Sequence, residues 1–93
     1  MIISFGSKET HKIWLGERIT GFHIQLQEIM RRKLRMLNNS QNIEDLKTPP
    51  SNKLEKLKGN FKEYYSIRVN IQRRIIFKWN NGNVSDVKII DYH

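Results

Sequence analysis

Asn81-Gly82 constrains the fold of this chain more than any other pair of residues. The dipeptide lies between two stretches rich in β-branched and aromatic residues, Arg73 to Trp79 and Val84 to Asp91. Asn-Gly is preferred in two-residue type I′ turns because both positions adopt a positive φ angle. The last third of the sequence is therefore predicted to contain an antiparallel β-hairpin.

The same turn sets the expected register of the hairpin. If Asn and Gly are the two loop residues, Arg74 lies opposite Ile89, and residues two apart on either strand share its face. Arg74, Asp91 and, if the strand continues, His93 then project from one side of the sheet. A β-bulge would shift this register by one residue.

The rest of the chain predicts an α+β fold. The expected elements are a strand at Met1 to Phe5, a helix that begins after Ser7 and ends at Gly16, a helix from Phe22 to Leu37, a helical turn at Ile43 to Leu46, and strands at Lys53 to Leu57 and Tyr64 to Asn70. Apolar residues at 3–4 spacing, among them Leu26, Met30 and Leu34, indicate the longer helix. Thr48-Pro49-Pro50-Ser51 should lack regular structure, because proline has no amide donor and restricts the residue before it.

Size and composition exclude several classes of protein. The 93 residues fit a single domain, residues 1–93, with one modest core. Cysteine is absent, which excludes disulfides and thiolate metal ligands, and three scattered histidines do not suggest a metal site. No apolar run could span a bilayer, and Met1 to Phe5 does not resemble a secretory signal. We therefore expect a cytoplasmic protein with no membrane association, no metal and no cofactor.

The charge of the chain favours a polyanionic partner. Seventeen Lys and Arg against nine Asp and Glu give a net charge of +8 and a pI near 10.1. Such an excess attracts nucleic acid at long range. The polar side of the longer helix carries Gln27, Glu28, Arg31, Arg32 and Arg35. Its three arginines are either solvated or form a surface that contacts RNA or a partner protein.

Several side chains in the last third suit the cleavage of RNA without a metal. The reaction needs a base for the 2′-hydroxyl, a cation for the charge of the phosphorane and an acid for the leaving 5′-oxygen. Arg74 suits the cation, because guanidinium grips two phosphate oxygens and stays protonated. His93 suits proton transfer near neutral pH. Lys58, beside Gly59, is a second candidate phosphate contact.

Each of these residues also has a structural interpretation. Arg74 could form only an ion pair with Asp91, and His93 could belong to a frayed terminus. Tyr92 could pack or could stack on a base. Glu55 is either a proton acceptor or an exposed strand carboxylate.

Several segments together resemble the HigB branch of the RelE/ParE toxin superfamily. They are Leu54-Glu55-Lys56-Leu57-Lys58-Gly59, Tyr64-Tyr65-Ser66-Ile67-Arg68-Val69, Arg73-Arg74-Ile75-Ile76-Phe77, the Asn81-Gly82 turn and Asp91-Tyr92-His93, with Met1 to Phe5 and Leu46 to Pro50 fitting the same branch. The resemblance covers essentially the whole chain. It implies a RelE/ParE-like fold in which an N-terminal strand and two helices pack on a curved, mainly antiparallel sheet.

The resemblance also implies a function. Members of the branch are ribosome-dependent mRNA endonucleases that enter the A site, cut translated mRNA and arrest growth. The implied partners are the ribosome, mRNA and a HigA-type helix-turn-helix antitoxin, through which alone the toxin would be associated with DNA.

Carried over residue by residue, the resemblance implies two sets of residues. The implied catalytic residues are Glu55, Lys58, Arg74, Asp91, Tyr92 and His93, and the implied RNA or ribosome contacts are Arg68 and Arg73, to which the helix arginines Arg31, Arg32 and Arg35 are added. Some relatives have a histidine where this chain has Glu55. The general base therefore stays open among Glu55, Asp91 and His93.

Two other functions are compatible with the same fold, because fold alone does not determine function. One is a ParE-like inhibitor of DNA gyrase without nuclease activity, and the other is a passive RNA-binding module. Lys58 and the Asp91-Tyr92-His93 tail favour the nuclease, since an inhibitor of gyrase needs no terminal groups for proton transfer.

Overall fold

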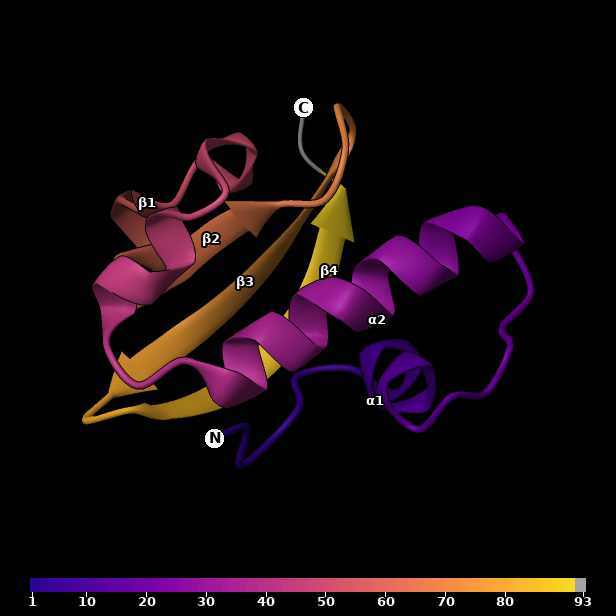
Figure 1. Ribbon diagram of the computed structural model, residues 1–93, viewed down its shortest axis with the longest axis horizontal. Coiled ribbons are helices and arrows are strands. Elements are labelled where there is room, and N and C mark those ends of the chain that lie inside the picture. The colour runs from indigo at the N-terminus through magenta and orange to yellow at the C-terminus, as the bar shows by residue number, and fades with distance from the viewer. Residues whose placement is uncertain (92–93) are drawn as a thin grey trace.

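Two α-helices and a four-stranded antiparallel sheet make up the described part of the chain (Figure 1). The computed structural model describes residues 1–91, so Tyr92 and His93 lie outside the described residues. The elements are α1 (Lys8–Trp14), α2 (Ile24–Asn39), β1 (Glu55–Lys56), β2 (Tyr65–Arg68), β3 (Arg73–Asn80), β4 (Asn83–Asp91) and the 3₁₀ helices η1 (Ile43–Lys47), η2 (Pro50–Asn52) and η3 (Gly59–Phe61). The strands lie side by side in chain order.

Both predicted helices form, and side-chain caps explain their ends. The Ser7 hydroxyl accepts a hydrogen bond from the Thr10 amide at 3.2 Å and begins α1. At the C-terminal end of α2, the Ser40 hydroxyl donates to the Leu37 carbonyl at 2.7 Å. Within residues 1–91, neither helix is long and apolar enough to cross a bilayer.

The helices cover one face of the sheet, and the core lies between the two layers. Figure 1 shows α2 crossing in front of β4 with α1 beside it. The fully buried residues between the layers are Ile13, Met30, Leu34, Leu37 and Leu46 from the helical layer and Ile67, Ile75, Phe77, Val84 and Val87 from the sheet. Ile76 is also fully buried. Burying each of these large side chains stabilises the fold by roughly 1.5–3 kcal/mol.

Gln27 was predicted on the polar side of α2, but it is buried. Its side chain is only 4% exposed and bonds to the loop between the helices. The amide oxygen accepts from the Ile19 amide at 3.1 Å, and the amide nitrogen donates to the carbonyls of Ile19 and Phe22 at 3.0 and 2.9 Å. A buried amide with three partners holds this loop in place.

The N-terminal segment is extended but forms two isolated bridges instead of the predicted continuous strand. Ile2 pairs with Val84, and Phe5 pairs with Val87, both in parallel. Between these bridges the Ser4 hydroxyl accepts from the Asp86 amide at 2.9 Å. The ladder is interrupted because β4 itself is irregular at Asp86.

Other connecting segments differ from the sequence prediction in detail. η1 confirms the expected turn. The proline stretch contains a regular element after all, since Pro50 occupies the first position of η2, where a missing amide donor costs nothing. The strand expected from Lys53 to Leu57 is limited to β1, because Lys53 has a left-handed conformation with φ 47°.

The hairpin turn is confirmed, but the predicted register holds only near the turn. Asn81 and Gly82 have φ angles of 50° and 85°, and Asn80 pairs with Asn83. Beyond Ser85 a β-bulge inserts Asp86, whose φ is 50°.

The bulge changes the partner of every residue beyond it. Arg74 lies opposite Ile90, not Ile89, and Asp91 lies opposite Arg73. The prediction that Arg74 and Asp91 share one face of the sheet is therefore wrong.

Candidate active site

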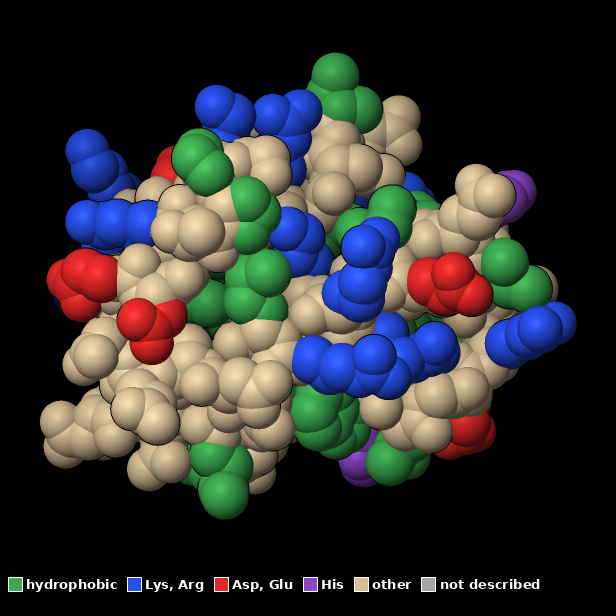
Figure 2. All heavy atoms as spheres, in the orientation of Figure 1, with side chains coloured by type: hydrophobic (Ala, Val, Ile, Leu, Met, Phe, Trp, Pro, Cys, Tyr) green, Lys and Arg blue, Asp and Glu red, His purple; other side chains and the backbone are tan. Residues whose placement is uncertain are grey.

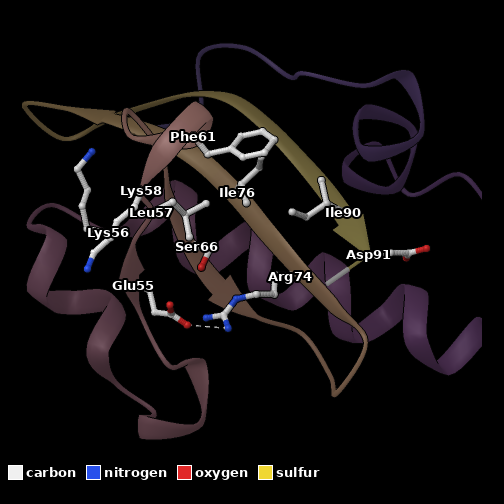
Figure 3. A pocket seen from close by; sticks show the side chains of 10 residues that line it. All are labelled: Glu55, Lys56, Leu57, Lys58, Phe61, Ser66, Arg74, Ile76, Ile90 and Asp91. Atoms are coloured by element: carbon white, nitrogen blue, oxygen red, sulfur yellow. Dashed lines mark ion pairs between the residues drawn. The ribbon is translucent and has the colours of Figure 1, made fainter. Parts of the chain in front are cut away.

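The face of the sheet that the helices leave open contains a cavity of about 540 Å³ (Figure 3). Side chains alternate along β3, so Ile75 and Phe77 enter the core while Arg74 and Ile76 point to the cavity. The cavity is lined by Glu55, Lys56, Leu57, Lys58, Phe61, Ser66, Arg74, Ile76, Ile90 and Asp91. Four of the predicted catalytic residues, Glu55, Lys58, Arg74 and Asp91, thus line this cavity, although they come from separate segments.

Arg74 is the best-fixed charge in the cavity. The residue is only 6% exposed. One terminal nitrogen lies 2.9 Å from the Glu55 Oε1 atom, and the other donates to the Lys53 carbonyl at 2.7 Å (Figure 3). A guanidinium held at both ends presents a fixed orientation to an incoming anion.

Glu55 reaches Arg74 because of how the edge strand pairs. Glu55 lies opposite Ser66 on β2. Arg74 lies on the next strand, β3, and its side chain is on the same face of the sheet. The Glu55 side chain is 46% exposed, so its carboxylate is accessible from the cavity. An exposed carboxylate beside a fixed guanidinium can accept a proton as well as orient the cation.

Two lysines stand at the rim of the cavity on the side of β1. Lys58 is exposed and precedes η3, which turns at Gly59 with a φ of 67°. Lys56 lies over the ring of Tyr65, with Nζ 5.0 Å from its centroid, and donates to the Lys62 carbonyl. Both side chains extend outward in Figure 3 and provide positive charge around the opening.

Asp91 reaches the margin of the cavity but does not join Arg74. Its carboxylate lies 3.3 Å from Arg73 Nε, and it points away from Arg74 in Figure 3. Arg73 itself is on the helix side of the sheet, with its guanidinium 4.7 Å from the centroid of the Phe22 ring. Arg73 is therefore held by packing and an ion pair within the described residues.

Arg68 lies next to the cavity, on the same face as Arg74. The two residues are cross-strand partners, and Arg68 Nε donates to the Asn70 carbonyl at 3.2 Å. Arg68 lines a shallow hollow of about 220 Å³ together with Lys53, Asn70, Ile71 and Arg74. This hollow shares Arg74 with the main cavity, so positive charge continues across this end of the sheet.

Some residues of the site were not predicted. Ser66 is fully buried in the wall of the cavity, and its hydroxyl has no hydrogen-bond partner among residues 1–91. The alternation of side chains along β2 could have predicted this place for Ser66, since Ser66 shares a face of the sheet with Arg68. Phe61 has no such signal, because its place depends on η3 folding back over the sheet.

The three arginines of α2 differ in exposure and in hydrogen bonding. Arg31 Nε donates to the Ile13 carbonyl at 2.8 Å and so links the two helices. Arg32 and Arg35 are exposed, and all three arginines line one shallow hollow with Glu28. Figure 2 shows basic side chains gathered across the middle of this face, in the region of α2. This surface lies on the helical side of the molecule, apart from the cavity.

Lys78 is a third basic residue of β3, beyond the cavity. It lies 3.2 Å from Asp86 and 3.6 Å from Glu63. The hydrogen bond to the Asp86 carboxylate raises the pKa of Lys78 above its usual value. Within residues 1–91, no three potential metal-ligating side chains come together.

The chain is similar to known toxins in sequence. A family model described as the RelE-like toxin of the type II toxin-antitoxin system HigB matches residues 5–93. Toxin HigB-1 of Vibrio cholerae is 46% identical over 57 residues, and an uncharacterized protein of Haemophilus influenzae is 45% identical over 62 residues. These alignments cover 61% and 67% of this chain, and in them the chain spans 60% and 61% of the relatives' length.

The fold is also found in solved structures. The YoeB-YefM complex from Staphylococcus aureus has a TM-score of 0.63 at 17% identity, covering 100% of this chain and 98% of that chain. A YoeB/ParE toxin from Agrobacterium tumefaciens has a TM-score of 0.53 at 18% identity and covers 96% of both chains. At such identities the likeness concerns the fold, and it confirms the α+β architecture. The family match spans nearly the whole sequence, and the chain therefore belongs to the HigB family of RelE-like toxins of type II toxin-antitoxin systems.

Proposed function

We propose that this toxin is a ribosome-dependent endoribonuclease that cuts translated mRNA in the A site and arrests growth. The observation that carries the proposal is the buried Arg74, held 2.9 Å from Glu55 in a cavity with basic residues at its rim. Membership of the RelE-like toxins supports it, as do the net charge of +8 and the pI near 10.1.

We assign the first proton transfer to Glu55. Its carboxylate takes the proton of a ribose 2′-hydroxyl, and the 2′-oxygen then attacks the adjacent phosphorus. Arg74 stabilises the negative charge that develops on the phosphorane oxygens. Asp91 is a weaker candidate for the base, because its carboxylate is paired with Arg73 and directed away from Arg74.

The contact between Glu55 and Arg74 couples the two steps. When Glu55 accepts the proton it loses its charge, so its attraction for Arg74 weakens as the phosphorane becomes more negative. The guanidinium then transfers its electrostatic interaction from the carboxylate to the phosphorane. Charge moves over a few ångströms in a partly enclosed site, where such interactions are stronger than in water.

The second half of the reaction requires an acid. The bond between phosphorus and the 5′-oxygen breaks, and a proton is delivered to that oxygen, which leaves a 2′,3′-cyclic phosphate and a 5′-hydroxyl end. We assign this proton to the C-terminal Asp91-Tyr92-His93 segment on the strength of the family resemblance, with His93 as the first candidate. Lys58 contributes a further cation for the phosphate.

Docking on the ribosome is assigned to basic residues outside the cavity. Arg32 and Arg35 are exposed on α2, and Arg68 is next to Arg74. These residues would contact phosphates of ribosomal RNA or mRNA without reading sequence. Arg31 and Arg73 are weaker candidates, because their side chains already hold structural contacts.

The proposed partner in the resting cell is an antitoxin. The solved complexes of similar fold contain YoeB bound to YefM. For this chain we propose a HigA-type helix-turn-helix antitoxin, which would also bring the toxin to operator DNA. A ribosomal target places the proposed activity in the cytoplasm.

The test is inducible expression of the toxin, followed by mapping of mRNA 5′ ends. The wild type should stop growth and produce cuts phased with the reading frame, whereas Glu55→Gln and a chain lacking His93 should each cut at least about 10²-fold more slowly. Thr20→Ala, a change at an exposed residue in the loop between the helices, is the control. Growth arrest with intact mRNA and DNA damage would replace the proposal with inhibition of gyrase. Binding to RNA without cutting would leave only a passive RNA-binding module.

A further inference from the structure

The cavity has two chemically different halves. Glu55, Ser66 and Arg74 form a polar half, while Leu57, Phe61, Ile76 and Ile90 form an apolar half (Figure 3). Proton transfer and charge stabilisation need only the polar half. The apolar half therefore needs an explanation of its own.

Phe61 gives this apolar half an aromatic surface. The residue is 43% exposed, although large apolar side chains are usually buried. Its ring meets Tyr64 edge to face, with centroids 5.9 Å apart and an interplanar angle of 74°, which holds its orientation. In Figure 3 the ring lies over Ile76, on the cavity side of η3. Exposed aromatic rings beside positive charge are the usual stacking surfaces for unpaired bases.

Ser66 gives the polar half an unused hydroxyl. The residue is fully buried, and no described residue forms a hydrogen bond with its oxygen. Ser66 lies directly opposite Glu55 on one side and Ile76 on the other, so it stands where the two halves meet. A buried hydroxyl without a partner is destabilising, which makes a ligand the natural partner.

We propose that the cavity holds one ribonucleotide of the RNA in a fixed orientation. The base stacks on Phe61 and rests against Ile90, and the ribose 2′-hydroxyl bonds to Ser66 Oγ beside Glu55. The proposal rests on the proposed function, since it identifies the nucleotide whose 2′-oxygen attacks. A volume of about 540 Å³ lies within the range of roughly 300–1,000 Å³ common for ligand sites.

The arrangement has a consequence for catalysis. A base fixed on Phe61 fixes the ribose to which it is attached, and Ser66 then directs the 2′-hydroxyl towards the Glu55 carboxylate. Phe61 and Ser66 are therefore positioning residues that act through the substrate, whereas Glu55 and Arg74 contact the reacting atoms. Stacking alone is tolerant of sequence, because every base has an aromatic face.

The stacking contact can be measured without ribosomes and without cleavage. A short single-stranded RNA that contains one 2-aminopurine should lose fluorescence when its base stacks on Phe61. Phe61→Ala should bind about 5- to 150-fold more weakly and should not quench, while Phe61→Trp should retain both binding and quenching. Leu15→Ala, which changes an apolar residue 59% exposed after α1, is the matched control. Unchanged quenching by Phe61→Ala, or no binding of this RNA by the wild type, would overturn the proposal.

The hydroxyl contact needs a test that separates binding from folding. Ser66→Ala should bind the RNA about 2- to 10-fold more weakly, and it should lose this penalty when the probe nucleotide is 2′-deoxy. Its thermal midpoint should equal or exceed that of the wild type, because an unpartnered hydroxyl is removed. Ser85→Ala, on β4 opposite Lys78, is the control. If Ser66→Ala still prefers ribose to deoxyribose as strongly as the wild type does, Ser66 does not contact the 2′-hydroxyl.

These measurements also separate failure of this inference from failure of the proposed function. Stacking and ribose preference without mRNA cleavage in cells would identify a nucleotide site on a protein that is not a nuclease. Cleavage that Phe61→Ala and Ser66→Ala leave unchanged would keep the nuclease and reject the nucleotide orientation.

Discussion

Arg73 and Arg74 are neighbours in sequence but have opposite environments. Arg74 lies on the open face of the sheet, 6% exposed, and its guanidinium is held by Glu55 and the Lys53 carbonyl in a cavity. Arg73 lies on the helix face, stacks on Phe22 and pairs with Asp91. The alternation of β3 alone separates them. Two identical side chains one residue apart therefore have different partners, Arg73 in the packed layer and Arg74 in the cavity.

The two faces of this small sheet hold an arginine charge in different ways. On the helix face an arginine contributes its long apolar stem and a stacked guanidinium to packing. On the open face the same group is immobilised by a carboxylate and a carbonyl beside an accessible cavity. The second arrangement costs stability when the cavity holds no anionic ligand, because the Arg74 charge is partly removed from water. Such a cost is expected at a functional site.

The largest effect expected from this comparison is the loss of cleavage by Arg74→Ala. Removing the cation at the phosphorane should slow mRNA cutting by about 10²-fold or more. Arg74→Lys should also be impaired, because an ammonium cannot keep both the Glu55 contact and a forked grip on phosphate. The measurement is the rate of cleavage of ribosome-bound mRNA by purified toxin. Normal cutting by Arg74→Ala would reduce Arg74 to a structural ion pair.

Arg73→Ala should have the opposite profile. Loss of the stacked guanidinium and its apolar stem should lower the free energy of unfolding by about 1 kcal/mol, while the cleavage rate stays within about threefold of the wild type. Urea denaturation and the same cleavage assay measure the two quantities. A double-mutant cycle of Arg73→Ala with Phe22→Ala isolates the free energy of stacking between the two side chains. If Arg73→Ala instead keeps its stability and loses cleavage, the roles assigned to the two faces are reversed.

The arginines of α2 extend the comparison to the helical layer. Arg32→Ala and Arg35→Ala should weaken ribosome binding several-fold and reduce the salt dependence of binding by about one unit of slope for each phosphate that is no longer neutralised. Arg31→Ala should mainly lower stability, since it removes the hydrogen bond to the Ile13 carbonyl. Sedimentation with ribosomes at several salt concentrations tests the first pair, and denaturation tests Arg31. Equal salt slopes in all variants would remove α2 from the ribosome-binding surface.

The smallest effect concerns Lys78, a charge on β3 outside the cavity. The pKa of Lys78 is raised by its hydrogen bond to Asp86, so the stabilising contribution is full below the unfolded-state pKa near 10.5 and is lost as pH rises through the folded-state value. Lys78→Met should flatten the alkaline end of the stability curve without affecting cleavage at neutral pH. Thermal unfolding between about pH 8 and 11 measures it. An unchanged alkaline slope would show that the pair contributes nothing to folding.

Local signals in the sequence predicted the elements well. The Ser7 cap, the 3–4 spacing of α2 and the Asn81-Gly82 turn each depend on a few adjacent residues, and the structure confirms all three. Tyr65 and Ile67 also alternate with polar residues in the sequence, and the face that they share packs in the core. These features were predictable because the physics that produces them is local.

The site depended on interactions that local patterns cannot reveal. The ion pair between Glu55 and Arg74 exists because β1 docks on β2, and nothing near either residue encodes that pairing. Gln27 looked like a surface residue because its three partners belong to a preceding loop. Asp86 looked like an ordinary strand residue, although its left-handed backbone alters the sheet. The roles of Tyr92 and His93 remain predictions from the resemblance.

The extra residue Asp86 shifts the pairing of the rest of β4 by one position. Before Asp86 the even-numbered residue Val84 faces the helices. After Asp86 the odd-numbered residues face the helices, so Val87 enters the core while Lys88 lies on the open side. If Asp86 joined the ladder as an ordinary strand residue, Val87 would turn to solvent and Asp91 would return to the side of Arg74. The backbone conformation of Asp86 thus decides which residues of β4 pack in the core and on which face of the sheet Asp91 lies.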